Sequence, residues 1–172
     1  MEKSRLLNKC RKIKILLTDV DGVLTDGGRY YSDRGEMLKK FHTRDGMGVN
    51  ILLRNGIKTI IVTKEISRIT KKWATDMNIT EIIGGAIRKE IILSKIEKKY
   101  KVSSDEIAFI GDDVNDIELL QKVGFSATPA DGADETKKVV DYICEKSGGK
   151  AAFRETADLI LKIQNPKKTN WY

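Results

Sequence analysis

Acidic side chains that follow two short apolar runs of the sequence form a candidate metal site. Asp19 and Asp21 come directly after the run at 13–17, and Gly111-Asp112-Asp113 follows the run at 107–110. Neighbouring carboxylates repel each other, and this repulsion raises the pKa of one of them unless a cation lies between them. The Asp-x-Asp pair alone would fit a turn or a calcium loop about as well. Together, the two clusters favour Mg²⁺, which a few carboxylates, water and a substrate phosphate commonly hold.

A hydroxyl and an ammonium would complete a phosphate site beside these carboxylates. Thr63 ends the apolar run at 57–62, and Lys89 opens the helix expected after the apolar residues Ile82 and Ile83. A neutral donor and a positive charge are what the oxygens of a transferring phosphoryl group require. Taken singly, Thr63 would be an ordinary residue at a strand end and Lys89 a surface lysine.

Four apolar runs alternate with amphipathic stretches of helical length, which predicts an α/β fold. The runs at 13–17, 57–62, 107–110 and 124–127 lack polar alternation, as do strands that are buried on both faces of a parallel sheet. We expect a doubly wound parallel sheet, whose active site lies at the carboxyl ends of the strands. Helices are expected at 45–55, 65–77, 88–100, 116–123 and 151–163.

The segment 27–41 does not fit this alternation and is predicted to form a β-hairpin. Two stretches with strand composition flank Asp33-Arg34-Gly35, which is a turn signal at hairpin spacing. A lone two-stranded ribbon is marginally stable in water, and this one would expose Tyr30, Tyr31 and Met37. The hairpin is therefore expected to project after the first strand and to be buried against other copies of the chain.

Length and composition indicate one domain over residues 1–172, with a core at 13–163 and a polar tail at 165–172. Two cysteines and one histidine are too few for a disulfide framework or a structural zinc site, which favours a reducing, cytoplasmic location. The apolar run near the N-terminus is short and leads into acidic residues. Neither a signal peptide nor a membrane span is expected.

The net charge of +7 is spread along the chain. Lysine doublets recur from Lys39-Lys40 to Lys167-Lys168 without a basic stripe interleaved with aromatic residues, so nucleic acid is not expected as a partner. Most of these lysines are expected to be solvated on helix faces. A basic protein nevertheless concentrates a small anionic substrate near its surface.

The motifs together resemble the haloacid dehalogenase superfamily of phosphohydrolases, whose four loop motifs stand in this order at strand ends. The resemblance covers nearly the whole chain and implies that Asp19 is the nucleophile and Asp21 the general acid and base. It implies that Thr63 and Lys89 bind the transferring phosphoryl group. Asp112 would then ligate magnesium together with Asp19 and the backbone carbonyl of Asp21.

The same resemblance implies that two further acidic residues, Asp113 and Asp116, either contact the direct metal ligands or bind the metal through a water molecule. Members of the superfamily with a large cap domain insert it between the first and second motifs or between the second and third. The spacings from Asp21 to Thr63 and from Thr63 to Lys89 leave no room for such a domain. A fold without a cap is therefore expected.

Capless members of this size are similar to the 3-deoxy-D-manno-octulosonate 8-phosphate phosphatases and to the phosphatases of acylneuraminate metabolism. The segments 41–46 and 148–155 carry this resemblance. It implies a homotetramer assembled through the hairpin at 29–41, in which the C-terminal segment of one subunit covers a neighbour's active site. It also implies a role in carbohydrate biosynthesis, including that of lipopolysaccharide.

Two departures from the octulosonate-phosphate pattern bear on the substrate. Lys64-Glu65 stand where Gly-Arg is usual, and Gly148-Gly149-Lys150-Ala151 stand where Gly-Gly-Arg-Gly is usual. The Glu65 change resembles relatives that act on nine-carbon keto-sugar acid phosphates. Alternatively, Glu65 only stabilises the N-terminus of the following helix. Candidate substrate-binding residues are Thr63, Lys64, Glu65, Lys89, Arg44, Lys150 and His42, the last of which has either a structural role or a substrate contact.

The leading hypothesis is a magnesium-dependent phosphomonoesterase that acts on the terminal phosphate of a 2-keto-3-deoxy sugar acid through an aspartyl phosphate. The first alternative is a capless phosphatase of broad specificity. The second is a non-enzymatic receiver-like domain, which also gathers acidic residues, a threonine and a lysine around magnesium. The order of the motifs argues against a receiver, because here the acidic pair lies on the first strand.

Overall fold

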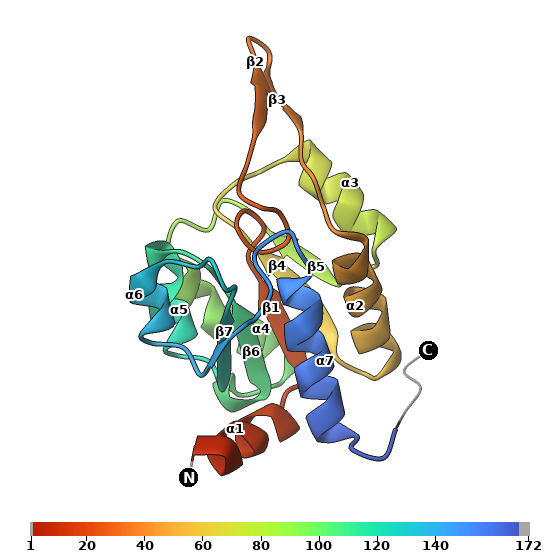
Figure 1. Ribbon diagram of the computed structural model, residues 1–172, viewed down its shortest axis with the longest axis vertical. Helices are drawn as coiled ribbons and strands as arrows, with labels where there is room; N and C mark the ends of the chain where they lie inside the picture. The colour runs from red at the N-terminus through yellow and green to blue at the C-terminus, as the bar shows by residue number, and fades with distance from the viewer. Residues whose placement is uncertain (1, 169–172) are drawn as a thin grey trace.

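The computed structural model describes residues 2–168, which are built around a six-stranded sheet (Figure 1). The strand order is β5-β4-β1-β6-β7-β8, and neighbouring strands are parallel. This confirms the doubly wound α/β fold expected from the apolar runs. The strands are β1 (Ile15–Thr18), β4 (Lys58–Val62), β5 (Glu81–Ile83), β6 (Ile107–Ile110), β7 (Phe125–Thr128) and β8 (Tyr142–Ile143).

The sheet is buried on both faces because alternate residues of each strand point to opposite sides. In β1, Leu16 belongs to one hydrophobic core, whereas Ile15 and Leu17 belong to the other. The Leu16 core is covered by α1 (Glu2–Arg11), α2 (Thr43–Arg54), α3 (Arg68–Asp76) and α7 (Ala152–Gln164). The other core is covered by α4 (Leu93–Tyr100) and α5 (Ile117–Leu120). The short helix α6 (Asp134–Lys137) follows β7.

A β-hairpin stands out from the body of the protein after β1, as the sequence predicts (Figure 1). Its strands, β2 (Tyr30–Ser32) and β3 (Gly35–Leu38), pair antiparallel in a sheet of their own. The hairpin exposes 58–64% of the surface of each of its large apolar residues, which are Tyr30, Tyr31, Met37 and Leu38. Water-exposed apolar side chains gathered on one ribbon mark an interaction surface.

The chain between the motif strands is short, and no cap domain is inserted there. Between β1 and β4 the described chain contains only the hairpin and α2 as regular elements. Between β4 and the 3₁₀ turn at Lys89–Ile92 it contains only α3 and β5. The expectation of a capless fold is therefore confirmed.

Several elements differ from the sequence-based expectations. The helix α1 was not expected, since its sequence is strongly charged; it is held by Leu6 and Cys10 in the core and by an ion pair between Lys9 and Asp141. The helix expected at 65–77 begins at Arg68, because Ser67 caps its N-terminus. The short elements β8 and α6 carry too little periodicity to be recognised.

The two ends of the chain complete the description. The backbone N–H of Asn165, the first residue of the expected tail, donates to the Leu161 carbonyl and ends α7. The part of that tail at 169–172 lies outside the described residues. Within residues 2–168 no helix combines the length and apolar character needed to cross a membrane.

Candidate active site

The carboxyl ends of β1, β4 and β6 open into a cavity of about 440 Å³. The strand order places β1 between β4 and β6, so that the loops after all three strands meet at one edge. This is the edge at which an open parallel sheet binds its ligands. The cavity is lined by Asp19, Asp21, Arg29, Thr63, Lys64, Glu65, Asp112, Asp113, Val114 and Asn115.

Asp19 lies at the floor of this edge, directly after β1. Its backbone N–H donates to the Ile110 carbonyl at 3.0 Å, which continues the β1–β6 pairing by one residue. Its Oδ1 accepts a hydrogen bond from the Val20 N–H at 2.7 Å. Its Oδ2 lies 2.6 Å from Nζ of Lys89. Burial raises the pKa of Asp19 to about 6, although the positive charge of Lys89 opposes this rise.

Lys89 is buried and bridges two carboxylates. Only 1% of its side chain is exposed, and its Nζ lies 2.6 Å from both Asp19 Oδ2 and Asp116 Oδ1. Burial alone would lower the pKa of Lys89, but the charges of Asp19 and Asp116 outweigh it and raise that pKa above its ordinary value. A lysine is almost never this buried without such partners. The interpretation of Lys89 as a surface lysine is therefore wrong.

Asp112 and Asp116 bring two more carboxylates to the same point. One oxygen each from Asp19, Asp112 and Asp116 lie within 4.8 Å of one another. Asp116 Oδ2 accepts from the Asp112 N–H at 3.0 Å, whereas the buried Asp112 Oδ1 has no hydrogen-bond partner among the described residues. Burial, followed by the charges of Asp19 and Asp116, raises the pKa of Asp112 to about 8.

This donor set fits a hard cation. Lys89 supplies one positive charge for three carboxylates and pairs with Asp19 and Asp116, so the buried Asp112 oxygen stays costly unless a further cation lies beside it. Gly22 makes room for the Asp112 carboxylate, since a Cβ at Gly22 would lie 1.9 Å from Asp112 Oδ2. The φ angle of Gly22, +87°, likewise favours glycine.

Asp21 lines the cavity, and its carboxylate is held from the hairpin side. Its Oδ1 lies 2.5 Å from Lys39 Nζ, and its Oδ2 lies 3.1 Å from Arg29 Nη2. Sequence analysis did not identify Arg29 or Lys39. The available signal was the presence of basic residues at the ends of a ribbon whose middle is apolar. Which carboxylate they pair with depends on the fold of the loop.

The remaining motif residues of the cavity come from the loops after β4 and β6. Thr63 is buried, and its Oγ1 accepts from the Glu65 N–H at 3.3 Å. The Glu65 carboxylate lies 2.5 Å from Arg29 Nη1, and Glu65 precedes the N-cap of α3 by two residues. Asp113 caps the turn after it by accepting from the Val114 N–H at 2.7 Å. Lys64 lines the cavity beside Glu65.

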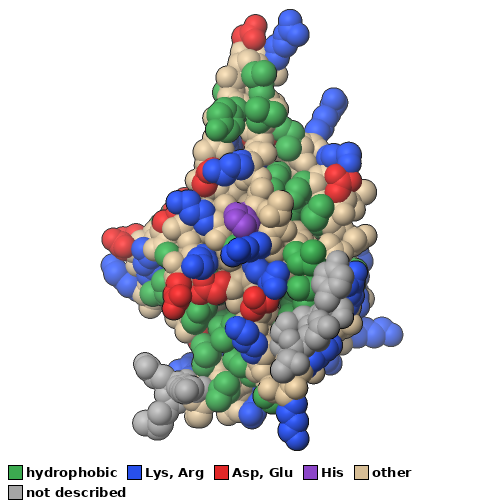
Figure 2. Space-filling view, turned by 45° about the vertical axis from the view of Figure 1, so that its right-hand side comes forward, with side chains coloured by type: hydrophobic (Ala, Val, Ile, Leu, Met, Phe, Trp, Pro, Cys, Tyr) green, Lys and Arg blue, Asp and Glu red, His purple; other side chains and the backbone are tan. Residues whose placement is uncertain are grey.

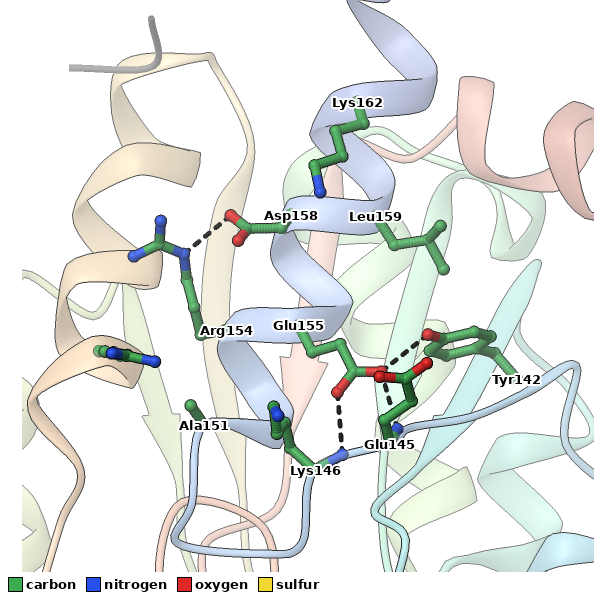
Figure 3. Close-up of a pocket in the computed structure, with 10 residues that line it drawn as sticks. Tyr142, Glu145, Lys146, Ala151, Arg154, Glu155, Asp158, Leu159 and Lys162 are labelled. Atoms are coloured by element: carbon green, nitrogen blue, oxygen red, sulfur yellow. Dashed lines mark hydrogen bonds and ion pairs between the residues drawn. The ribbon is translucent and has the colours of Figure 1, made fainter. Parts of the chain in front are cut away.

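Four of the seven candidate substrate-binding residues are not among the described residues that line this cavity: Lys89, which is buried against Asp19, and the three that follow. The single histidine, His42, caps α2, since its Nδ1 accepts from the Arg44 N–H at 3.1 Å. Lys and Arg side chains surround this histidine in Figure 2. Arg44 lines a separate cavity of about 480 Å³ along α7 (Figure 3). Lys150 is exposed. A substrate contact by any of the three stays a prediction.

Comparison with known proteins agrees with this geometry. Residues 55–151 match the family model of the haloacid dehalogenase-like hydrolases. The 3-deoxy-D-manno-octulosonate 8-phosphate phosphatase of Haemophilus influenzae is 37% identical over 91% of this chain and 87% of that protein. The phosphatase of the same name from Escherichia coli is 34% identical over 92% of this chain and 85% of its own length.

Solved structures show the same fold. The Moraxella catarrhalis 3-deoxy-D-manno-octulosonate 8-phosphate phosphatase, in complex with magnesium, phosphate and the KDO molecule, superposes with a TM-score of 0.91 at 36% identity. That superposition covers 94% of this chain and 93% of the other. A cobalt-bound phosphatase from Haemophilus influenzae gives a TM-score of 0.89 at 37% identity, covering 91% and 92%.

The raised carboxyl pKa values predict how pH and magnesium act on stability. Burial raises the pKa of Asp112 to about 8 and that of Asp19 to about 6, from an unperturbed value of 3.8. Ionising them in the folded protein is therefore costly, and the free energy of unfolding should fall between about pH 4 and about pH 8 by on the order of a few kcal/mol. Magnesium favours the ionised carboxylates. The rise in melting temperature on adding Mg²⁺ should therefore grow with pH.

Thermal unfolding followed by circular dichroism, with chelator and with Mg²⁺ across this pH range, measures both effects. Asp112→Ala is the control, because it removes the group with the larger shift. In this variant most of the pH-dependent gain from Mg²⁺ should be lost. A gain in melting temperature that is equal at all pH values, or unchanged in Asp112→Ala, would contradict the assignment of Asp112 to the metal.

Proposed function

The chain belongs to the haloacid dehalogenase-like hydrolases, and we propose that it is a magnesium-dependent phosphomonoesterase acting on the terminal phosphate of a 2-keto-3-deoxy sugar acid. The observation that carries this proposal is the buried Lys89, paired with Asp19 at the floor of a cavity that also contains Asp21 and Asp112. A nucleophilic carboxylate and a phosphate dianion repel each other, so fixed positive charge at this point is what phosphoryl transfer needs.

In the proposed mechanism Asp19 attacks phosphorus in line with the leaving oxygen and forms an aspartyl phosphate. The hydrogen bond from Val20 and the ion pair with Lys89 fix the direction of the Asp19 carboxylate. Asp21 gives a proton to the leaving alkoxide, and later takes one from the water that splits the aspartyl phosphate. One carboxyl group thus serves both half-reactions.

Phosphate oxygens would be held by Thr63 and Lys89. Thr63 is buried at the cavity wall, and its hydroxyl, which accepts from the Glu65 N–H, can donate to a phosphate oxygen. Mg²⁺ would be held by Asp19, Asp112 and the backbone carbonyl of Asp21, with Asp113 and Asp116 supporting it. When bound, it would neutralise charge that develops on the transferring phosphoryl group. This role of Asp116 is supported by its ion pair with Lys89 and by the hydrogen bond that it accepts from the Asp112 N–H.

The natural substrate is proposed to be octulosonate 8-phosphate, on the basis of the relatives described above, with nonulosonate 9-phosphates as the second candidate. The second candidate rests on Glu65, which stands at the cavity wall where the octulosonate enzymes usually have Arg. In this chain the Glu65 carboxylate forms an ion pair with the Arg29 guanidinium. Because this ion pair neutralises Arg29, less positive charge remains in the cavity to bind a substrate carboxylate. The oxygens of Glu65 can instead accept hydrogen bonds from hydroxyl groups or an amine of the substrate.

We also propose that the chain assembles as a homotetramer through the hairpin at 29–41. The apolar side chains of β2 and β3 are exposed in the single chain, and burial against other copies would remove them from water. A substrate contact by Arg44, His42 or Lys150, and coverage of a neighbour's site by the C-terminal segment, belong to the same proposal.

Replacing the nucleophile tests the mechanism. Asp19→Asn should abolish hydrolysis of p-nitrophenyl phosphate, to less than about a thousandth of the unaltered rate, because a carboxylate is required to form the aspartyl phosphate. The fold should persist, since an amide fits the same space and circular dichroism should be unchanged. Turnover above that level by the folded variant would contradict a nucleophilic Asp19.

Exchanging the residues after Thr63 tests the substrate assignment. Lys64→Gly combined with Glu65→Arg removes one of the two partners of Arg29, leaves its ion pair with Asp21, and replaces an acidic by a basic side chain at the cavity wall. The ratio of kcat/KM for octulosonate 8-phosphate to kcat/KM for a nonulosonate 9-phosphate should rise about tenfold, as for one charged hydrogen bond. Hydrolysis of p-nitrophenyl phosphate should change little. An unchanged ratio would show that Glu65 does not select the sugar acid.

Assembly is tested by removing the ribbon. Light scattering of the unaltered chain at micromolar concentration should give the mass of four copies. Replacing residues 29–41 by a short glycine linker should give monomers, because the exposed apolar surface of the hairpin is lost. Their activity on the sugar-acid phosphate should be low, because Arg29 and Lys39, which hold Asp21, are removed as well. A monomeric unaltered chain would refute the proposed assembly.

A further inference from the structure

We propose that Lys39, a residue of the hairpin outside every motif of the family resemblance, is a positioning residue that fixes the Asp21 carboxylate for its proton transfers. The inference rests on the proposed phosphatase function and names a residue that this function does not otherwise use. It follows from the two ion pairs of Lys39, one with Asp21 in the loop after β1 and one with Glu36 in the hairpin.

Lys39 is buried although it belongs to an exposed ribbon. Only 1% of its side chain is exposed, whereas its neighbour Lys40 exposes 63%. Its Nζ lies 2.5 Å from Asp21 Oδ1 and 3.3 Å from Glu36 Oε1. Ordering and desolvating a lysine is costly, and only close negative partners offset that cost. Lys39 therefore has one stable place, between these two carboxylates.

The second partner of Lys39 is itself anchored to the body of the protein. Glu36 Oε2 accepts a hydrogen bond from Ser67 Oγ at 2.8 Å, and Ser67 caps the N-terminus of α3. A chain of contacts thus runs from α3 through Glu36 and Lys39 to Asp21. The Asp21 carboxylate is held against a rigid helix and not only by its own loop.

Lys39 and Arg29 hold Asp21 in different ways. Arg29 lines the cavity, exposes 31% of its side chain and divides its guanidinium between Asp21 Oδ2 and Glu65. An anionic substrate entering the cavity reaches Arg29 directly. Lys39 is not among the described residues that line the cavity, so its hold on Oδ1 remains when substrate is bound.

This arrangement assigns the two oxygens of Asp21 to different tasks. Oδ1 is fixed by Lys39, and Oδ2, the oxygen facing Arg29, carries the transferred proton. As the bond from phosphorus to the leaving oxygen breaks, the proton passes from Oδ2 to that oxygen. When water then forms its bond to phosphorus and the bond from phosphorus to Asp19 breaks, Oδ2 takes a proton from the water.

The experiment compares two aryl phosphates of similar shape in Lys39→Met. p-Nitrophenolate leaves without help from an acid, whereas the more basic phenolate needs a proton from Asp21. Because kcat/KM reports the steps up to phosphorylation of Asp19, its loss should be at least about tenfold greater for phenyl phosphate than for p-nitrophenyl phosphate. Asp21→Asn should show the same dependence on the leaving group, and more strongly.

Lys40→Met is the matched control, because Lys40 is exposed and pairs with Asp26, away from Asp21. It should leave both kcat/KM values unchanged. Lys39→Met leaves Glu36 without its cation, so Glu36→Gln combined with Lys39→Met is made as well. This second variant removes both members of the buried pair and decides the question if the single variant aggregates.

An equal loss on both aryl phosphates, or no loss, in a folded Lys39 variant would overturn the inference and leave the lysine a structural role only. A gain on phenyl phosphate would also overturn it, because Lys39 would then restrain Asp21 from acting. Failure of the unaltered chain to hydrolyse p-nitrophenyl phosphate with Mg²⁺ is a separate result. It would remove the proposed function itself.

Discussion

The buried ion pairs of Lys89 are the interaction on which the rest of the site depends. Asp19, Asp112 and Asp116 place their oxygens within 4.8 Å of one another, and Lys89 is the positive charge that contacts two of the three. Leaving one charged member of such a buried group unpaired costs several kcal/mol. The 3₁₀ turn that carries Lys89, the parallel pairing of β1 with β6, and the cap at Asp113 all serve to bring these charges together.

Glycine makes that concentration of charge sterically feasible. A Cβ at Gly22 would overlap the Asp112 carboxylate, and a Cβ at Gly148 would lie 1.9 Å from the Gly22 carbonyl oxygen. The loop before α7 is therefore packed directly on the loop that follows Asp19. Since Asp45 of α2 accepts from the Arg154 N–H in the first turn of α7, the position of α7 is tied both to α2 and to this loop. The Gly148-Gly149 segment is therefore a close backbone contact between the two loops.

Features fixed by local sequence could be predicted, and features fixed by distant partners could not. The unbroken apolar runs identify the strands, and the acidic residues after β1 and β6 necessarily meet because these strands are neighbours. The pairing of Asp21 with Lys39 joins residues of a loop and a ribbon, and no periodicity reports it. The helix α1 is held by two core residues, Leu6 and Cys10, and by the ion pair of Lys9 with the distant Asp141, and its apolar face is too short to stand out in the sequence. The start of α3 is set by Ser67, whose side chain accepts a hydrogen bond from the Thr70 N–H.

The hairpin carries two kinds of surface, and their separation along the ribbon links assembly to chemistry. Tyr30, Tyr31 and Met37 are exposed on the projecting strands, whereas Arg29 and Lys39 at its base pair with Asp21. An isolated ribbon is marginally stable, and its base is held by the ion pairs, by the contact of Glu36 with Ser67 and by the stacking of Phe41 on Trp73. Burial of the apolar strands against other copies would restrict the motion of the whole ribbon, including its base. The order of the Asp21 carboxylate would then depend on assembly, although no residue of the apolar surface contacts the cavity among the described residues.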